Sequence, residues 1–557
     1  MALFIVKRRL IKCKAFFMTC IKLKYCLFFL SVLILFRLLH STKPLKKFMQ
    51  VVSNPTPTLN LNYLVLHLDL KGTPPTLRYL QDLVPTLQPF GVNSLLMEYE
   101  DMFPYEGRLV NLSARNCYDK QELKIFLNLV HTLGIEVIPL VQTFGHMEHV
   151  LKLKEFMHLR EVTRFPSEIC PSKNESIQLI AEMLEQVIQF HTSIVPLKHI
   201  HIGCDEVYHI NVCSKCRQQK LDNTMLYINH VKAVDNVIRK LSPQTTVLIW
   251  NDMLTHRQNA LRSLDLNLSN IEPVYWDYRD HFKVSHKELF EYHKVFNNIW
   301  VASAFKGADS IEGILPDLTA RFRNNRQWLK IITNYHFAGE NKAYQFKGII
   351  LTGWSRYSHM SPPCELLTSS IPSLILNLLL IKAVTGGIFF GDLYYMNDCE
   401  LYDKHLRANF ENNFGHSSVH GTSKCAFEGN TFHKQITKYF NVHCCKSSLR
   451  TFEFLENNFR MQNINLLELQ KGITTYNNVI DELLQQSEDL KEYMMPYYDN
   501  DTIHEYVSYK IGNHIASLRN TLNILQNYTK VTFWERRPYH KSLAEKTKIT
   551  KTGHLIN

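Results

Sequence analysis

The chain has 557 residues, 45% of them apolar and 20% charged, values typical of a globular protein. Its formal net charge of +12 is concentrated in residues 1–47, which hold eleven lysines and arginines and no acid, so the other 510 residues carry a net charge of +1. This nearly neutral body excludes the basic surface of a nucleic-acid-binding protein, and we expect no nucleic-acid partner.

The N-terminal region predicts a membrane anchor. Residues 1–24 are a basic tail, and residues 25–40 are an apolar run that contains Arg37. The run is shorter than the roughly 20 residues of a typical spanning helix, but basic side chains at its ends can reach the membrane interface. No small-residue cleavage site follows, and residues 41–58 are a polar, proline-containing stem.

The charge bias across this run predicts a single-pass type II membrane protein with a signal-anchor and a lumen-facing body, in the Golgi or another secretory-pathway membrane. The alternative is a cleaved signal peptide and a secreted or lysosomal protein. Weak support for a luminal glycoprotein comes from five Asn-x-Ser/Thr sequons, at Asn111, Asn174, Asn267, Asn500 and Asn527.

Ten of the thirteen cysteines follow the anchor, so disulfides are plausible in a lumen, although the sequence does not give their pairing. Cys213 and Cys216 form a Cys-x-x-Cys pair. No second pair stands at a zinc spacing, so we favour a local disulfide or simple packing over a redox or zinc motif.

A strand-helix rhythm begins at residue 59. Two capping-box patterns, 119–122 and 172–175, open helices that we expect to end at Gly134 and near His191. Another amphipathic helix is predicted over 224–241. The strand-like segments between such helices are 63–70, 94–100, 136–141, 199–206, 245–252, 271–278, 299–307 and 348–354.

Eight strand-helix units in about 300 residues predict an α/β fold of the (β/α)₈ TIM-barrel type. The competing doubly wound sheet usually has a glycine-rich phosphate turn after an early strand, and none is found. We assign the barrel to residues 59–399, with an apolar helix over 374–390 closing its wall. Residues 400–557 are predicted to be mainly helical, for example over 465–492 and 506–528, with a loose basic tail.

The most informative segment is the fourth strand, 199–206, which ends in Asp205 and Glu206. Catalytic groups of such barrels lie at the C-terminal ends of the strands. Two adjacent acids repel each other unless a proton, a cation or a substrate group lies between them. The alternative is an ordinary acidic turn.

The other strand ends supply carboxylates and aromatic rings, a combination that suits a sugar. Aromatic faces stack on pyranose rings, and carboxylates bind hydroxyls and transfer protons. Taken singly, Trp250 and Trp276 could be core residues and His146 a surface histidine. The predicted substrate-binding residues are Glu98, His146, Trp250, Asp252, Trp276, Asp277, Tyr278 and Trp354.

A metal hydrolase is the rival interpretation, because His146, Asp205 and Glu206 are possible ligands. The paired-histidine spacing of such sites is missing, so we predict neither a metal nor another cofactor. A chitinase-type barrel is disfavoured because its spaced Asp-x-x-Asp-x-Asp-x-Glu strand is absent from the sequence.

Four segments resemble motifs of the family 20 glycoside hydrolases, the β-N-acetylhexosaminidases, most closely in their hexosaminidase D branch. His201-Ile202-Gly203-Cys204-Asp205-Glu206 resembles the family's His-x-Gly-Gly-Asp-Glu strand. The other three segments are 97–105, 142–148 and 250–253. The resemblance covers about residues 60–400.

The resemblance implies an exo-acting hydrolase that removes terminal β-linked GlcNAc or GalNAc from a glycan or glycoconjugate with retention of configuration. The substrate's own acetamido oxygen would attack the anomeric carbon and form an oxazolinium ion. Glu206 would be the general acid and base, and Asp205 would hold the acetamido N–H.

The resemblance also implies roles for the surrounding residues. Tyr278, with Asp277, would hold the acetamido carbonyl, and the three tryptophans would wall the pocket. His146 would support the acids and Glu98 would bind hydroxyls.

Two departures from the family pattern stand out. Cys204 replaces a glycine, and Lys71-Gly72 stands where the larger family has a sugar-binding arginine. The alternative function is a sugar-binding protein on the same barrel that has weak or no turnover, and the intact acid pair favours the enzyme.

Overall fold

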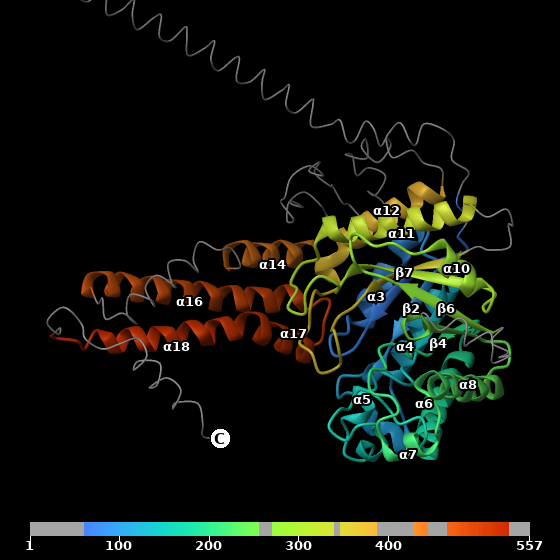
Figure 1. Cartoon of the computed structure of the whole chain (residues 1–557). Helices are drawn as coiled ribbons and strands as arrows, with labels where there is room; N and C mark the ends of the chain where they lie inside the picture. Colours follow the sequence, from blue (N-terminus) through green and yellow to red (C-terminus); the bar gives the residue numbers. More distant parts are fainter. Residues whose placement is uncertain are drawn as a thin grey trace, which may run out of the picture.

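The computed structural model describes residues 59, 61–255, 270–338, 346–386, 427–443 and 465–533. Eight parallel strands close into a barrel in chain order, with β8 pairing back onto β1, and helices surround it (Figure 1). This closure confirms the (β/α)₈ prediction and excludes a doubly wound sheet. The predicted basic tail, anchor and stem lie outside the described residues. The strands are β1 Tyr63–Asp69, β2 Ser94–Glu98, β3 Glu136–Leu140, β4 His199–His201, β5 Thr246–Trp250, β6 Ile271–Trp276, β7 Ile299–Lys306 and β8 Phe346–Gly353.

Strand β4 is shorter than predicted, because it ends at His201 rather than at Glu206. Gly203, Cys204 and Glu206 have φ angles of 67°, 66° and 48°. These left-handed conformations are incompatible with a strand. The acid pair therefore lies on a turn that follows the strand, at the C-terminal end of the barrel.

The helices around the barrel follow the predicted order, but one predicted cap is wrong. Asp119 caps α4 by accepting hydrogen bonds from the amides of Gln121 and Glu122. At α6 the N-cap residue is Lys173, without a side-chain cap, and the Ser172 hydroxyl instead donates to the Cys216 sulfur at 3.1 Å. The longer helices here are α3 Leu77–Leu87, α4 Lys120–Thr132, α6 Asn174–Thr192, α8 Asn223–Leu241, α10 His286–His293, α11 Leu318–Ala338 and α12 Ile371–Thr385.

Short helices occupy several connections at the two ends of the barrel. The four- and five-residue α-helices are α5 Glu148–Leu151 and α7 Ser214–Gln218. The short 3₁₀ helices are η1 Gln88–Phe90, η2 Glu100–Met102, η3 Gly107–Leu112, η4 Met157–Leu159, η5 Asp252–Leu254 and η6 Thr368–Ser370.

Helix α12 packs against α11, β7 and η1 (Figure 1). The window Thr368–Thr385 is apolar and long enough to cross a membrane, but 83% of it is buried within the protein. Burial against the sheet accounts for its apolar sequence, so this is the helix predicted to close the wall, beginning at Ile371 rather than residue 374.

A second group of helices follows the barrel in sequence. It comprises α14 Asn430–His443, α16 Leu466–Met494, α17 Asn500–Val507, a π-helical turn η8 Ser508–Gly512, and α18 Asn513–Tyr528. Helices α14, α16 and α18 lie side by side and extend away from the barrel (Figure 1). Their shared apolar core also takes in Ile314 and Leu366 from barrel loops, so the two parts pack together.

Candidate active site

The acid pair lies around His146 at the C-terminal end of the barrel. His146 Nε2 is 3.3 Å from Asp205 Oδ2 and 3.4 Å from Glu206 Oε2. The Asp205 side chain is 10% exposed and the Glu206 side chain 36% exposed, so Glu206 faces outward. Asp205 Oδ1 is buried and accepts no hydrogen bond from any described residue.

His146 controls the charges of this trio. Burial opposes the imidazolium, but the charge of Asp205 and hydrogen bonds to both acids raise the pKa of His146 well above its usual value. The hydrogen bond from His146 also lowers the pKa of Glu206, against the opposing effect of burial. The trio therefore favours an imidazolium between two carboxylates.

Close backbone packing fixes the turn that carries the pair. A Cβ on Gly145 would lie 2.1 Å from the backbone oxygen of Asp205, and a Cβ on Gly203 would lie 1.8 Å from Gln142 Oε1. Cys204 occupies the left-handed conformation where the family pattern has glycine, and its sulfur lies 3.2 Å from Thr143 Oγ1. Strained conformations of this kind cost about 1–3 kcal/mol each and are concentrated at functional sites.

Asp252 connects the acid pair to the aromatic wall. Its Oδ2 accepts the backbone N–H of Glu206 at 2.9 Å, and its Oδ1 accepts the indole N–H of Trp276 at 3.3 Å. Burial and the charge of Asp205 raise the pKa of Asp252 to about 7. Asp252 is thus a carboxyl that can be protonated near neutral pH, next to the acid pair.

Aromatic rings surround the end of the barrel interior. Trp250 lies inside the barrel with 1% exposure, and its ring centroid is 5.9 Å from that of Trp354. Tyr278 stacks on Trp276 at 5.3 Å and meets Trp354 edge-on at 6.4 Å. These four predicted residues are therefore brought together, with Trp250 as floor rather than exposed wall.

A cleft of about 660 Å³ is lined in part by Asp252, Trp276 and Tyr278, and Asp252 links it to the acid pair by accepting the backbone N–H of Glu206. Asp277 also lines it, but its carboxylate is paired with the Arg279 guanidinium. The backbone carbonyl of Asp277 accepts hydrogen bonds from Asn324 and Trp328. Of the two side chains predicted to hold an acetamido carbonyl, Asp277 is therefore engaged by Arg279, whereas Tyr278 packs against Trp276 and Trp354.

Glu98 is the last residue of β2 and lies in a buried network of charged side chains. Its Oε2 is 3.0 Å from His67 Nε2, and its Oε1 is 3.1 Å from Lys71 Nζ. Burial would raise the pKa of Glu98, but Lys71 and His67 lower it overall. Both carboxylate oxygens of Glu98 already have partners within the protein. The predicted contact between Glu98 and sugar hydroxyls therefore stays a prediction.

Sequence reasoning found Lys71 and Glu100 at strand ends without giving either a role in the site, and it missed His359. Lys71 Nζ lies 3.0 Å from Asp69 and 3.7 Å from Glu100, and 5.1 Å from the centroid of the Trp354 ring. His359 Nδ1 is 2.8 Å from Glu100 Oε2. Burial raises the pKa of Glu100 to about 8, although Lys71 opposes this.

Lys71 follows β1, Glu100 follows β2 and His359 follows β8, so three separate connections of the barrel bring these groups together. His359 comes from far along the chain, outside the four segments that resemble family motifs. The signal available in the sequence was the position of Lys71 two residues after Asp69 at a strand end, where the family pattern has a cation.

Potential metal ligands also gather outside the pocket. Within the described ranges, Glu161, Cys170, Cys213 and Cys216 are the side chains that converge with metal-ligand spacing.

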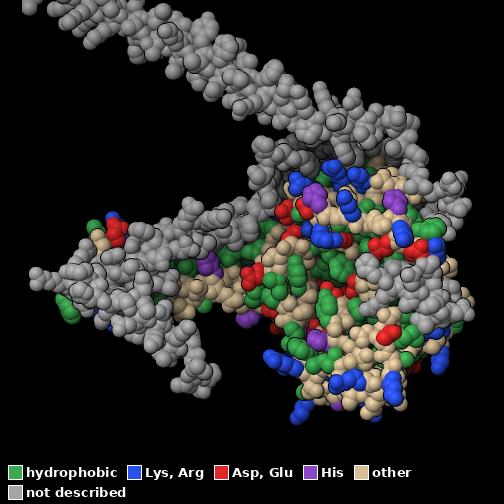
Figure 2. Space-filling model, viewed as in Figure 1, with side chains coloured by type: hydrophobic (Ala, Val, Ile, Leu, Met, Phe, Trp, Pro, Cys, Tyr) green, Lys and Arg blue, Asp and Glu red, His purple; other side chains and the backbone are tan. Residues whose placement is uncertain are grey.

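Basic and acidic side chains are interspersed over the visible face of the barrel (Figure 2).

Comparison with known proteins links this geometry to a family. The family model described as "Glycosyl hydrolase family 20, catalytic domain" matches residues 58–295. "Hexosaminidase D" of Bos taurus is 40% identical over 362 residues, which cover 64% of this chain and 97% of that protein. "Hexosaminidase D" of Homo sapiens is 40% identical over 365 residues, covering 64% of this chain and 70% of that protein.

Solved structures give a more distant similarity. A β-N-acetylhexosaminidase from Bacteroides fragilis aligns with a TM-score of 0.44 and 15% identity, covering 60% of this chain and 71% of that one. An exo-β-N-acetylglucosaminidase from Vibrio harveyi, in complex with N-acetylglucosamine, aligns with a TM-score of 0.40 and 16% identity, covering 57% and 54%. The sequence relatives, rather than these structures, carry the family assignment.

Proposed function

This chain belongs to glycosyl hydrolase family 20 and is a glycoside hydrolase of the β-N-acetylhexosaminidase type, and we propose that it removes terminal β-linked GlcNAc or GalNAc from glycoconjugates. In this proposal the enzyme is exo-acting and retains the anomeric configuration. The carbonyl oxygen of the substrate's acetamido group is the nucleophile, so the enzyme supplies none.

The first step forms a bond between the acetamido oxygen and the anomeric carbon as the glycosidic C–O bond breaks. Glu206 gives its proton to the leaving oxygen, and an oxazolinium ion forms. Asp205 accepts the acetamido N–H and stabilises the positive charge that develops on this group. Water then attacks the anomeric carbon as the bond between that carbon and the acetamido oxygen breaks, which restores the acetamido group, and water gives a proton back to Glu206.

The observation that supports this proposal best is the state of Asp205. Its Oδ1 is buried without a donor among the described residues, while its Oδ2 faces His146. An unpartnered buried carboxylate oxygen costs free energy, which a substrate N–H donor would recover. Glu206 is more exposed, as a group that protonates a leaving aglycone has to be.

Hydrolysis of chromogenic β-GlcNAc and β-GalNAc substrates tests the proposal. We expect Glu206→Gln to lower kcat/KM by roughly 10²–10⁴-fold, because it removes the transferable proton. Asp205→Asn should lower it by roughly 10²–10³-fold, because it removes the charge beside the acetamido group.

Glu492→Gln, on the exposed face of α16, is the control and should keep wild-type rates. A folded wild-type protein with no activity on either substrate would favour a sugar-binding protein instead. A mild effect of Asp205→Asn would argue against the acetamido group as nucleophile, and wild-type rates in Glu206→Gln would argue against that residue as the acid.

A further inference from the structure

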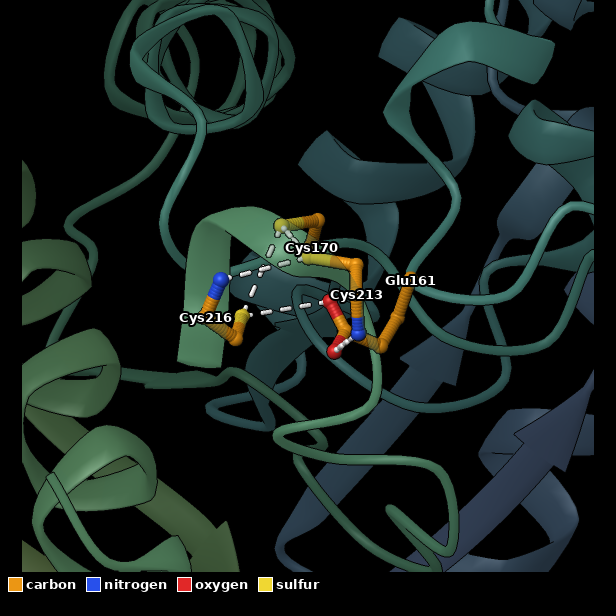
Figure 3. A group of neighbouring side chains, drawn as sticks. All are labelled: Glu161, Cys170, Cys213 and Cys216. Carbon is orange, nitrogen blue, oxygen red and sulfur yellow. Dashed lines mark hydrogen bonds between the residues drawn. The ribbon is translucent and has the colours of Figure 1, made fainter. Parts of the chain in front are cut away.

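Three cysteines and a glutamate form a compact cluster away from the acid pair (Figure 3). The sulfur of Cys170 lies 3.3 Å from that of Cys213 and 3.6 Å from that of Cys216. The sulfur of Cys216 lies 3.2 Å from Glu161 Oε2. All four donor atoms lie within 4.8 Å of one another.

These spacings are close to the edges of a tetrahedral zinc site. Zn–S bonds of about 2.3 Å and Zn–O bonds of about 2.0–2.2 Å place neighbouring donor atoms about 3.5–3.8 Å apart. Small adjustments of side-chain torsions would bring the observed distances to these values. Three soft thiolates with one carboxylate favour zinc over magnesium or calcium, which prefer sites made only of oxygen ligands.

Neighbouring groups already orient the donors. Glu161 Oε1 accepts the backbone N–H groups of Val212 and Cys213 at 2.6 Å and 2.8 Å, which turns Oε2 toward the sulfurs. The Cys216 amide donates to the Cys213 sulfur at 3.3 Å, and the Ser172 hydroxyl donates to the Cys216 sulfur at 3.1 Å. Such outer contacts fix ligand orientation in metal sites.

Burial fits a closed structural site. Glu161 is 3% exposed, and Cys170 and Cys216 are fully buried, whereas Cys213 is partly exposed and gives an entry path. A local disulfide would use two of the sulfurs and leave a buried thiol facing a buried carboxylate. A metal would use all four donor atoms, whereas a disulfide would leave the carboxylate with a single thiol partner.

We propose that Glu161, Cys170, Cys213 and Cys216 bind one zinc ion. The metal ties together the two loops that carry the acid pair and its histidine. Glu161 and Cys170 lie in the connection from β3 to α6, which also carries His146, and the other two ligands lie in the connection from β4 to α8, which carries Asp205 and Glu206. Binding releases the thiol protons to solvent.

The connection from β3 to α6 is itself held in shape next to the ligands. Arg160 and Ile169 form an antiparallel bridge, next to which the Glu161 amide donates to the Glu168 carbonyl and the Cys170 amide donates to the Leu159 carbonyl. The two connections also meet at Glu168, whose carboxylate accepts from His209 at 3.1 Å. The zinc ion would thus reinforce an existing contact between the loops, and its role is in positioning rather than in chemistry.

Metal analysis of the purified full chain tests the site directly. We expect about one zinc per chain. Removal of the metal by a strong chelator should lower the Tm by at least about 5 °C, because the bound ion stabilises only the folded state. Chelation should also speed proteolysis in the loop near Tyr208 and Val212, which are 72% and 44% exposed.

Variants assign the ligands. Cys216→Ser and Glu161→Gln should each lower zinc content or affinity at least about tenfold. Cys117→Ser changes a half-buried cysteine outside the cluster and should keep the wild-type zinc content. Cobalt added to the metal-free wild-type chain should give the visible absorption of a tetrahedral thiolate site, and Cys216→Ser should lose it.

Several results would overturn the proposal. One is wild-type protein without bound zinc, or with another metal in its place. Another is a Cys170–Cys213 disulfide found by thiol alkylation and mass spectrometry. Equal zinc content in Cys216→Ser and Cys117→Ser would place the metal elsewhere. Because the wild-type measurements stand alone, a variant that fails to fold leaves the test intact, and none of these results depends on hydrolase activity.

Discussion

His146 lies between two acids that must differ in protonation during the proposed reaction. Its hydrogen bond lowers the pKa of Glu206, which is the group that must carry a proton in the first step. A lowered pKa means that the protonated form of Glu206 is lost already at acidic pH. His146 therefore contacts both acids and also influences the pH range in which Glu206 keeps its proton.

We therefore expect kcat/KM to be highest at acidic pH and to fall as the pH rises and Glu206 loses its proton. His146→Gln removes the imidazolium, so the pKa of Glu206 should rise and the alkaline limb of the kcat/KM profile should move up by roughly one pH unit. The measurement is the pH profile of hydrolysis for the variant and the wild type.

His131→Gln, an exposed change on α4, is the control and should leave the profile unchanged. An alkaline limb that stays in place in His146→Gln would show that another group controls it, with Asp252 the first candidate because its pKa is about 7.

For single residues, the sequence predicted which side chains lie at the strand ends but not all of the side chains that they contact. Asp205, Glu206, Asp252 and the aromatic residues could be found because each ends a strand or follows one within a few residues, and parallel strands end at one side of the barrel. Lys71 could not be assigned, since its meaning depends on three carboxylates that only the closed barrel brings around it.

At the scale of elements, two loops interlock behind the acid pair. The loop after β3 passes so close to the turn after β4 that only glycine fits at position 145, where a Cβ would lie 2.1 Å from the Asp205 carbonyl oxygen. The obstacle is backbone rather than a flexible side chain, so one of the two loops would have to move.

We expect Gly145→Ala to lower kcat/KM by at least about 10²-fold, because a shift of about 1 Å in a catalytic group has an effect of this size. The check is steady-state kinetics together with the Tm. The matched control is Gly134→Ala, since Gly134 also resists substitution, with a φ of 71°, but has no atom within 4 Å of its Cβ position.

The control should cost about 1 kcal/mol of stability and leave activity unchanged. Wild-type kinetics in Gly145→Ala would show that the two loops tolerate separation and that their contact does not position Asp205.

Elements were predicted more reliably than their ends. The eight strands follow from apolar runs separated by helical patterns. The predicted end of β4 was wrong, because an apolar run that contains a glycine does not show that residues 203 and 204 adopt left-handed backbone conformations. The cap at Ser172 was also wrong, because the hydroxyl has a better-placed partner in Cys216, which is distant in sequence.

At the scale of the whole molecule, the C-terminal helices contribute to the barrel end. The Arg356 guanidinium donates to the backbone carbonyls of Lys71 and Gly72 and pairs with Glu505 of α17 at 2.6 Å. Pro75 and Tyr498 form a β-bridge. The sequence predicted the helices of this region but not their packing, because a helical pattern does not say what its apolar face meets.

We also propose the membrane topology predicted from residues 1–47, with the body in a secretory lumen. The sequon asparagines Asn111, Asn174, Asn500 and Asn527 are exposed, so oligosaccharyltransferase could reach them. Protein from secretory cells should shift in mobility after peptide-N-glycosidase treatment. A mutant with all sequon asparagines changed to glutamine is the control and should not shift, and an unshifted wild type would contradict the topology.

An oxidising lumen favours disulfides over zinc thiolates. The thiol count of the same preparation therefore bears on both proposals: reduced Cys170 and Cys213 in a glycosylated chain would support the metal site, and a disulfide between them would contradict it.

The contact between Arg356 and Glu505 also has a consequence for biosynthesis. The loop holding Lys71 emerges early from the ribosome, whereas the glutamate that braces it through Arg356 lies in the last tenth of the chain. At about 5–20 residues per second, Glu505 follows Lys71 by roughly 20–90 s. During this interval we expect the barrel end to lack its contact with α17, so the nascent chain should depend on chaperones until translation is nearly finished.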